Sequence, residues 1–177
     1  MMFDPTIFDN LKVVFEGAMY DMDLSGELQI VNRTDRVELS AMSRSFGMEA
    51  VRKPDGAVKG SFFLKASLAD LSAELLAEQG KQPGCSLELE FVYPIQEPAR
   101  DCEEAEAILR SIWGEAPSIL QVVQTVYGQE PSVRTNHVTV QFSRKLDERQ
   151  IDDIPSLLEH LALSMERLER QGNAASR

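Results

Sequence analysis

Histidine, the commonest general base, and cysteine, the most reactive nucleophile, are both few in this sequence. Its only histidines are His137 and His160, and its only cysteines are Cys85 and Cys102. The cysteines form no CxxC pair, and two imidazoles are too few for a three-histidine zinc site. The acidic neighbours of Cys102 raise the pKa of its thiol, which opposes formation of the thiolate. The sequence therefore predicts no catalytic residue, no metal site and no cofactor.

One acidic turn has the spacing of a partial calcium site. Asp21, Asp23 and Ser25 alternate and are followed by Gly26, as in the first half of a calcium-binding loop. The twelfth position is Asn32, however, where such loops carry a bidentate glutamate. The pattern favours a plain turn, and cation binding by Asp21, Asp23 and Ser25 is left open.

Basic residues gather in one part of an otherwise acidic chain. The whole chain has 18 basic and 29 acidic residues, a formal net charge of −11, yet seven of its basic residues and only four acidic ones lie within 30–65. Arginine suits bidentate contacts with carboxylates and phosphates. We predict that Arg36, Arg44 and Arg52 line a surface for a small anion or an acidic partner. The alternative is that they pair with the protein's own acidic residues.

Length, composition and charge limit the class of protein. The chain has 177 residues, of which 43% are hydrophobic and 27% charged, as in an ordinary globular domain. A net charge of −11 argues against a binder of nucleic acid or of anionic membranes. The N-terminus does not read as a signal peptide, and no apolar run approaches 18 residues. We expect a cytoplasmic protein with one domain over 1–172 and a disordered tail over 173–177.

The first third of the chain reads as β-structure. Strands are expected at 11–20, 27–31, 36–52 and 58–66, with a hairpin turn at Lys53–Gly56. Within 36–52, the apolar residues change from odd positions, such as Val37, to even positions, such as Phe46. A strand repeats every two residues, so this change requires an extra residue. We predict a β-bulge between Met42 and Gly47, or a break into two strands there.

The remainder alternates helices and strands. A helix is expected to begin at Ser67, which caps it together with Asp70 three residues on, and to stop at Gly80. Further helices are expected at 101–113 and at 153–170, and strands at 84–93 and 137–143. Segment 117–127 is ambiguous, because its Val and Tyr content favours a strand while its spacing favours a helix, which we adopt. The predicted order is ββββαβααβα. The expected fold is α+β, an antiparallel sheet with an N-terminal four-stranded meander and later strands, covered by helices.

The last predicted helix has an apolar seam. Its members are spaced by four and three residues, as in a heptad repeat: Ile154, Leu158, Leu161, Met165 and Leu168. The helix either docks on its own sheet or also contributes to a homodimer through Leu158, Leu161 and Met165.

Two classes of function remain open after this reading. The first is a non-catalytic binding or regulatory module that acts through protein contact and self-associates. The second is a small enzyme for an anionic substrate, whose site is assembled from distant residues. A deep polar pocket that holds His137 or a cysteine beside arginines favours the enzyme. A flat apolar patch at a two-fold axis favours the module.

Overall fold

The fold is a six-stranded antiparallel sheet combined with α-helices, so the predicted α+β class is confirmed. The computed structural model describes residues 6–76 and 79–175. The strands are β1 (Leu28–Glu38), β2 (Ser43–Arg52), β3 (Lys59–Ala66), β4 (Ser86–Ile95), β5 (Ser118–Thr125) and β6 (Arg134–Gln141). The helices are α1 (Thr6–Leu24), α2 (Leu68–Leu76), α3 (Pro98–Trp113) and α4 (Ile154–Ala175), with a short 3-10 helix, η1 (Glu148–Asp153), before α4.

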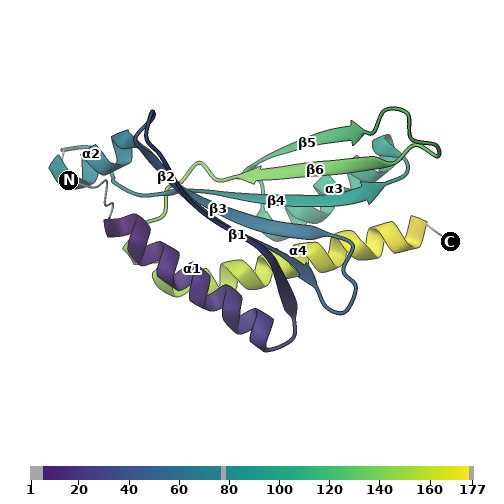
Figure 1. Cartoon of the computed structure of the whole chain (residues 1–177), viewed down its shortest axis with the longest axis horizontal. Helices are drawn as coiled ribbons and strands as arrows, with labels where there is room; N and C mark the ends of the chain where they lie inside the picture. The colour runs from purple at the N-terminus through teal and green to yellow at the C-terminus, as the bar shows by residue number, and fades with distance from the viewer. Residues whose placement is uncertain (1–5, 77–78, 176–177) are drawn as a thin grey trace.

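The strands follow the order β1-β2-β3-β4-β6-β5, so β1 and β5 are the two edges of the sheet. The first four strands form a meander, and α2 joins β3 to β4 at one end. Helices α1, α3 and α4 lie on one face of the sheet (Figure 1). We call this face the helix face and the opposite face the open face.

The core lies between the helix face and the helices. Phe62 of β3 stacks on Phe15 of α1, with ring centroids 4.7 Å apart, and lies 5.9 Å from the ring of Phe46. Helix α4 crosses β3 closely at Gly60, where a Cβ atom would lie 2.5 Å from the sulfur of Met165. A side chain at position 60 would therefore push α4 away from the sheet.

The structure corrects the predicted first strand, because residues 11–20 belong to α1. The buried residues of α1 are Phe8, Leu11, Phe15 and Met19, spaced by three or four, which is the helical period. The Val and Tyr content that suggested a strand includes side chains that point away from the core, since Val13 is 67% exposed. Spacing, not β-propensity, decides the structure of this segment.

The predicted strand over 36–52 is interrupted, as the change of parity required, but at a different place. A turn at residues 39–42 separates β1 from β2, in place of a bulge between Met42 and Gly47. A register shift does occur in β1, between Ile30 and Asn32. The predicted alternative, a break into two strands, is therefore correct. The break lies at residues 39–42, however, which is N-terminal to the predicted position.

Two turn and cap predictions are confirmed. The chain reverses after β2 at Lys53–Gly56, where the N–H of Gly56 donates to the carbonyl of Arg52 at 2.8 Å. Ser67 and Asp70 form the reciprocal capping pair at the start of α2: the Asp70 N–H donates to the Ser67 hydroxyl, and the Ser67 N–H donates to the Asp70 carboxylate.

Segment 117–127, predicted as a helix, forms the strand β5. Its residues alternate between the two faces because β6 pairs with it along its whole length. Ile119 packs against the core, whereas Leu120 is 59% exposed on the open face. The helical spacing of its apolar residues is thus overridden by strand pairing.

The apolar seam of α4 docks on the protein's own sheet. Leu158, Leu161 and Met165 are each 0% exposed in the core. These three side chains are therefore not on the surface, and a homodimer cannot use them while α4 stays docked. Helix α4 also extends to Ala175, so it includes 173–175 of the predicted tail, and 176–177 lie outside the described residues.

Candidate functional site

The three arginines predicted to share a surface are not brought together. Arg44 lies on the helix face, where it pairs with Asp9 at 2.8 Å and Asp35 at 3.4 Å and covers the ring of Phe8. Arg52 pairs with Glu169 of α4 at 3.1 Å. The acidic residues of the protein itself thus hold both guanidinium groups, as the alternative reading expected.

Arg36 lies apart from the other two, because its position in β1 faces the opposite side of the sheet. It lines a shallow hollow on the open face, together with Asn32, Thr34, Ser45, Phe63, Lys65, Glu88 and Glu90. The two carboxylates offset the two cations in this hollow. Burial and the neighbouring Glu88 raise the pKa of Glu90. The hollow has no excess of positive charge, and anion binding there stays a prediction.

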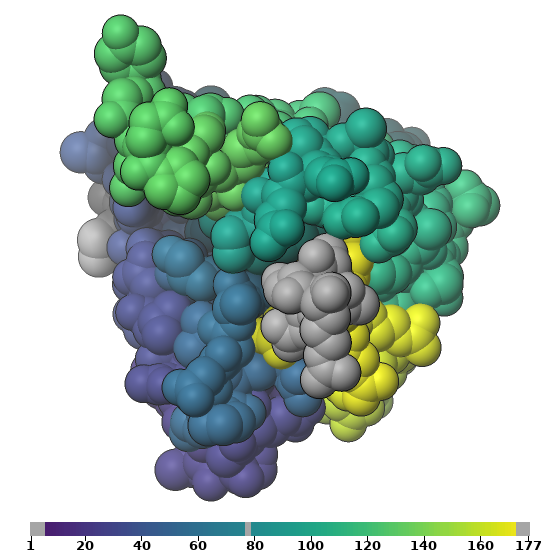
Figure 2. All heavy atoms as spheres, turned by 90° about the vertical axis from the view of Figure 1, so that its right-hand side faces the viewer, coloured from purple at the N-terminus to yellow at the C-terminus, as the bar shows by residue number. Residues whose placement is uncertain are grey.

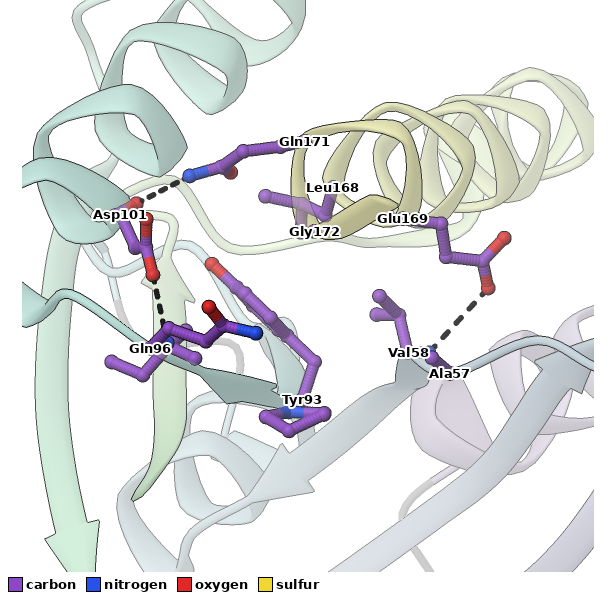
Figure 3. A pocket seen from close by; sticks show the side chains of 11 residues that line it. Ala57, Val58, Tyr93, Gln96, Asp101, Leu168, Glu169, Gln171 and Gly172 are labelled. Carbon is purple, nitrogen blue, oxygen red and sulfur yellow. Dashed lines mark hydrogen bonds between the residues drawn. The ribbon is translucent and has the colours of Figure 1, made fainter. Parts of the chain in front are cut away.

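A deeper pocket lies between the end of β4, the β2–β3 turn and the end of α4 (Figure 3). Its volume is about 180 Å³, and its lining includes Tyr93, Asp101, Glu169 and Gln171. Most of these polar groups already serve the fold. The Asp101 carboxylate accepts from the backbone N–H groups of Gln96 and Glu97, both at 2.9 Å. Burial raises the pKa of Tyr93 to about 12, so its hydroxyl stays protonated at neutral pH.

Among the residues that the structure describes, no histidine, cysteine or arginine lines this pocket. His137 lies on the open face between Val92 and Val122 of the neighbouring strands. His160 is exposed on α4, where its Nδ1 lies 2.6 Å from the carbonyl of Ser156. The arrangement that favoured an enzyme, a polar pocket holding His137 or a cysteine beside arginines, is not found among the described residues.

The acidic turn with calcium-like spacing lies at the end of α1. The Asp23 carboxylate accepts from the N–H of Ile30 at 3.0 Å and from the Lys53 ammonium group at 3.0 Å. These hydrogen bonds lower the pKa of Asp23. Within residues 6–76 and 79–175, no group of three or more His, Cys, Asp or Glu side chains has the arrangement of a metal site.

Both thiols are expected to resist alkylation in the folded protein. Cys85 is 1% exposed, and burial raises the pKa of its thiol to about 12. Burial and the adjacent Asp101 also raise the pKa of Cys102. At pH 8 iodoacetamide should modify Cys85 in the native protein at least about 100-fold more slowly than in urea, because its thiol is rarely ionised and is out of reach, and it should also modify the half-buried Cys102 more slowly. Mass spectrometry of tryptic peptides measures the rates. Rapid native labelling of Cys85 would contradict the placement of this residue.

The surface with the clearest capacity for binding is the edge strand β5 with the tip of the β5–β6 hairpin. This hairpin (green) projects from the body of the molecule (Figures 1 and 2). Residues 116–129 contain no charged side chain, the longest such run in the sequence. Most of its large apolar side chains are well exposed: Leu120 59%, Val122 46%, Val123 37%, Val126 56% and Tyr127 102%. We call this surface the β5 edge.

One backbone edge of β5 is hydrogen-bonded to β6, so the opposite backbone edge is the one that another strand could pair with. The side chain of Gln121 fixes the strand in place. The Gln121 amide donates to the Cys102 carbonyl of α3 at 2.8 Å and accepts from the buried Asn136 of β6 at 2.8 Å. Asn136 in turn donates to the Tyr93 hydroxyl at 3.2 Å. This buried string of hydrogen bonds ties β5 to α3 and β6, so the edge is presented in a fixed position.

The two edges of the sheet differ in how they are protected. Natural sheets usually guard an exposed edge with charges, because unpaired backbone groups invite pairing with another chain. The C-terminal half of β1 carries four charged residues: Arg33, Asp35, Arg36 and Glu38. Residues 116–129 of the β5 edge include no charged residue. The sequence analysis missed this site, although the long uncharged run was a signal that could have indicated it.

Comparisons with known proteins add no assignment. No protein-family model matches the sequence, and no curated protein is significantly similar to it. None of the helices within residues 6–76 and 79–175 combines the length and the apolar composition that a membrane span requires.

Proposed function

We propose that the protein is a non-catalytic binding module that acts through protein contact, by pairing the β5 edge with a strand of another chain. The observation that carries this proposal is the uncharged, apolar and exposed edge strand. Strand addition gains backbone hydrogen bonds for affinity, while the alternating side chains give specificity. Leu120 and Val122 on the open face would supply the apolar contacts of the added strand.

The chemistry of the remaining surfaces supports contact over catalysis. In the pocket described above, the carboxylates of Asp101 and Glu169 already accept hydrogen bonds from backbone N–H groups. The thiols have raised pKa values, which disfavours nucleophilic attack. A flat apolar patch at a two-fold axis was named above as favouring a module, and the exposed apolar side chains of the β5 edge support that choice.

The same proposal places the module in the cytoplasm. Cys85 and Cys102 are both free thiols, one buried and one half-buried. Free thiols are typical of proteins kept in a reducing compartment. Their raised pKa values also keep them from exchanging with disulfides.

A charge placed on the β5 edge tests the proposal. Val122→Lys is expected to reduce recovery of bound protein about tenfold or more, because pairing would bury an unpaired ammonium group. The matched control is Val13→Lys, since Val13 is 67% exposed on α1, away from this edge. The tagged wild type and both variants are purified from the native cells, and the proteins bound to each, the same chain included, are quantified by mass spectrometry.

The wild type and Val13→Lys should recover the same proteins, and Val122→Lys should lose them. Circular dichroism checks that both variants remain folded, which is expected because both positions are exposed. Equal recovery by Val122→Lys and Val13→Lys would show that the β5 edge binds nothing, and the proposal would fall.

A further inference from the structure

We infer that the strand added to the β5 edge is β5 of a second copy of this chain, paired antiparallel about Gln121. This inference rests on the proposed function, since it names the partner at the same edge. It predicts a two-fold dimer in which the two sheets join into one sheet of twelve strands, six from each copy.

Symmetry limits the possible registers. In antiparallel pairing about a two-fold axis, directly opposite residues must lie on the same face of the joined sheet. Faces alternate along a strand, so the axis must pass through a residue and not between two residues. Strand β5 spans 118–125, and its two central residues are Gln121 and Val122. The registers with the longest overlap are therefore those about Gln121 and about Val122.

The pattern of polarity selects the register about Gln121. In this register Leu120 lies opposite Val122 of the second copy on the open face. Ile119 lies opposite Val123 on the helix face. The polar ends also match, because Ser118 then lies opposite Gln124. The strand from Ser118 to Gln124 thus reads the same in polarity in both directions, which makes it complementary to itself.

The register about Val122 lacks this match. It sets Leu120 opposite Gln124, Ile119 opposite Thr125 and Gln121 opposite Val123. Each of these pairs joins an apolar residue to a polar one. Cross-strand pairs contribute most when both members are apolar and in contact, so the register about Gln121 is favoured.

Charge explains why a second copy would pair at this edge. Two copies that each carry a net charge of −11 repel one another, and most surfaces of the chain would bring like charges together. The uncharged run over 116–129 lets two copies approach without opposing charges along the strand. Self-association through this edge should therefore strengthen with added salt, which screens the remaining repulsion.

The projecting hairpin tip adds to the same contact. Continued beyond β5, the register places Val126 opposite Ala116 of the second copy and Tyr127 opposite its Glu115. Tyr127 is 102% exposed in the single chain, and Val126 is 56% exposed. In this pairing both side chains would contact the segment that joins α3 to β5 in the second copy. These contacts would make the interface larger than the paired strands alone.

A charge-swap experiment tests both the dimer and its register. Leu120→Lys and Val122→Glu are each expected to raise the dissociation constant of the dimer about tenfold or more, because each buries an unpaired charge. Mixed in equal amounts, the two variants should recover a dimer. The register about Gln121 sets the introduced lysine of one copy opposite the introduced glutamate of the other, and leaves Val122 opposite Leu120 at the second position.

The matched control mixes Leu120→Lys with Gln124→Glu. These two charges would face each other only in the register about Val122, so Leu120→Lys should not be recovered in a dimer in this mixture, whereas Gln124→Glu, whose charge lies opposite Ser118, should still pair with itself. Sedimentation velocity over a range of concentrations measures each state, and circular dichroism confirms that every variant is folded. All of these positions lie on the exposed open face of β5, so folding does not depend on them.

The outcomes separate this inference from the proposed function. A wild type that remains monomeric at the highest attainable concentration overturns the dimer, and the strand-addition proposal then stands or falls on the recovery experiment with Val122→Lys. A dimer that contains Leu120→Lys in the Gln124→Glu mixture, and none in the Val122→Glu mixture, overturns the register about Gln121. A dimer that none of the edge variants weakens overturns both the inference and the β5 edge as its site.

Discussion

Replacing Leu161 with glutamate is expected to unfold the protein and not merely to separate a dimer. Leu161 is 0% exposed and lies in the core between α4 and the sheet. A carboxylate there would be buried without a partner, and the apolar contacts of the leucine would be lost. We expect a loss of about 4 kcal/mol or more in the free energy of unfolding, a large part of the total stability of a typical domain. Urea denaturation followed by circular dichroism measures it.

The control for this experiment is Leu120→Glu, the same substitution at an exposed position of β5. It should change the free energy of unfolding of the monomer by about 0.5 kcal/mol or less. A Leu161→Glu variant as stable as wild type, and monomeric where wild type is dimeric, would place Leu158, Leu161 and Met165 in a dimer interface instead of the core.

Arg44→Ala is expected to destabilise the protein by about 2 kcal/mol at pH 7. The change removes the partner of Asp9 and Asp35 and uncovers the ring of Phe8. Burial acts to raise the pKa of Asp35, but the hydrogen bonds and charges of Lys12 and Arg44 outweigh it and hold the pKa below 3.8. This stabilisation is present above pH 3.8 and is lost as the pH falls through the lowered pKa, so the difference from wild type should shrink in acid.

Arg36→Ala is the companion variant, because Arg36 is exposed and makes no ion pair with the described residues. Its free energy of unfolding should stay within about 0.5 kcal/mol of the wild-type value. Equal stabilities of the two variants would show that Arg44 is not held as described. Phosphate titrations of the melting temperature test anion binding in the hollow that Arg36 lines: a shift in wild type that Arg36→Ala abolishes would support it.

Secondary structure was predicted most reliably for elements that have one buried face and one exposed face. In β4 the residues Leu87, Leu89 and Phe91 alternate with Glu88 and Glu90, and the burial of the strand alternates in the same way. Helix α3 and the capping pair at the start of α2 were likewise predicted, because amphipathic spacing and reciprocal capping are local properties of the chain.

The errors arose where two local signals disagreed. In α1 the β-branched and aromatic residues Val13, Phe15 and Tyr20 suggested a strand. The spacing of Leu11, Phe15 and Met19, by contrast, is that of a helix, and the helix forms. In β5 the opposite happened, since helical spacing yielded to pairing with β6. Pairing with a distant strand is a tertiary effect, so no local pattern in 117–127 could settle it.

The candidate site was missed for a related reason. The sequence analysis looked for an excess of positive charge and chose Arg36, Arg44 and Arg52. The face of the sheet on which each arginine lies depends on the β1–β2 turn and on the register shift in β1. The sequence did not predict the correct positions of these two features. A lack of charge identifies an interface only once the strand is known to be at an edge.

The position of α4 at one end of the chain has a consequence for biogenesis. The ribosome completes all six strands before it reaches residue 154, yet α4 supplies Leu158, Leu161 and Met165 to the layer that covers them. Until α4 emerges, the helix faces of β2, β3 and β4 are covered only in part, by α1. A nascent chain stalled before α4 would therefore expose apolar strands and be prone to aggregation or chaperone binding. Docking of α4 on the sheet is thus expected to complete the apolar core only after all six strands have been made.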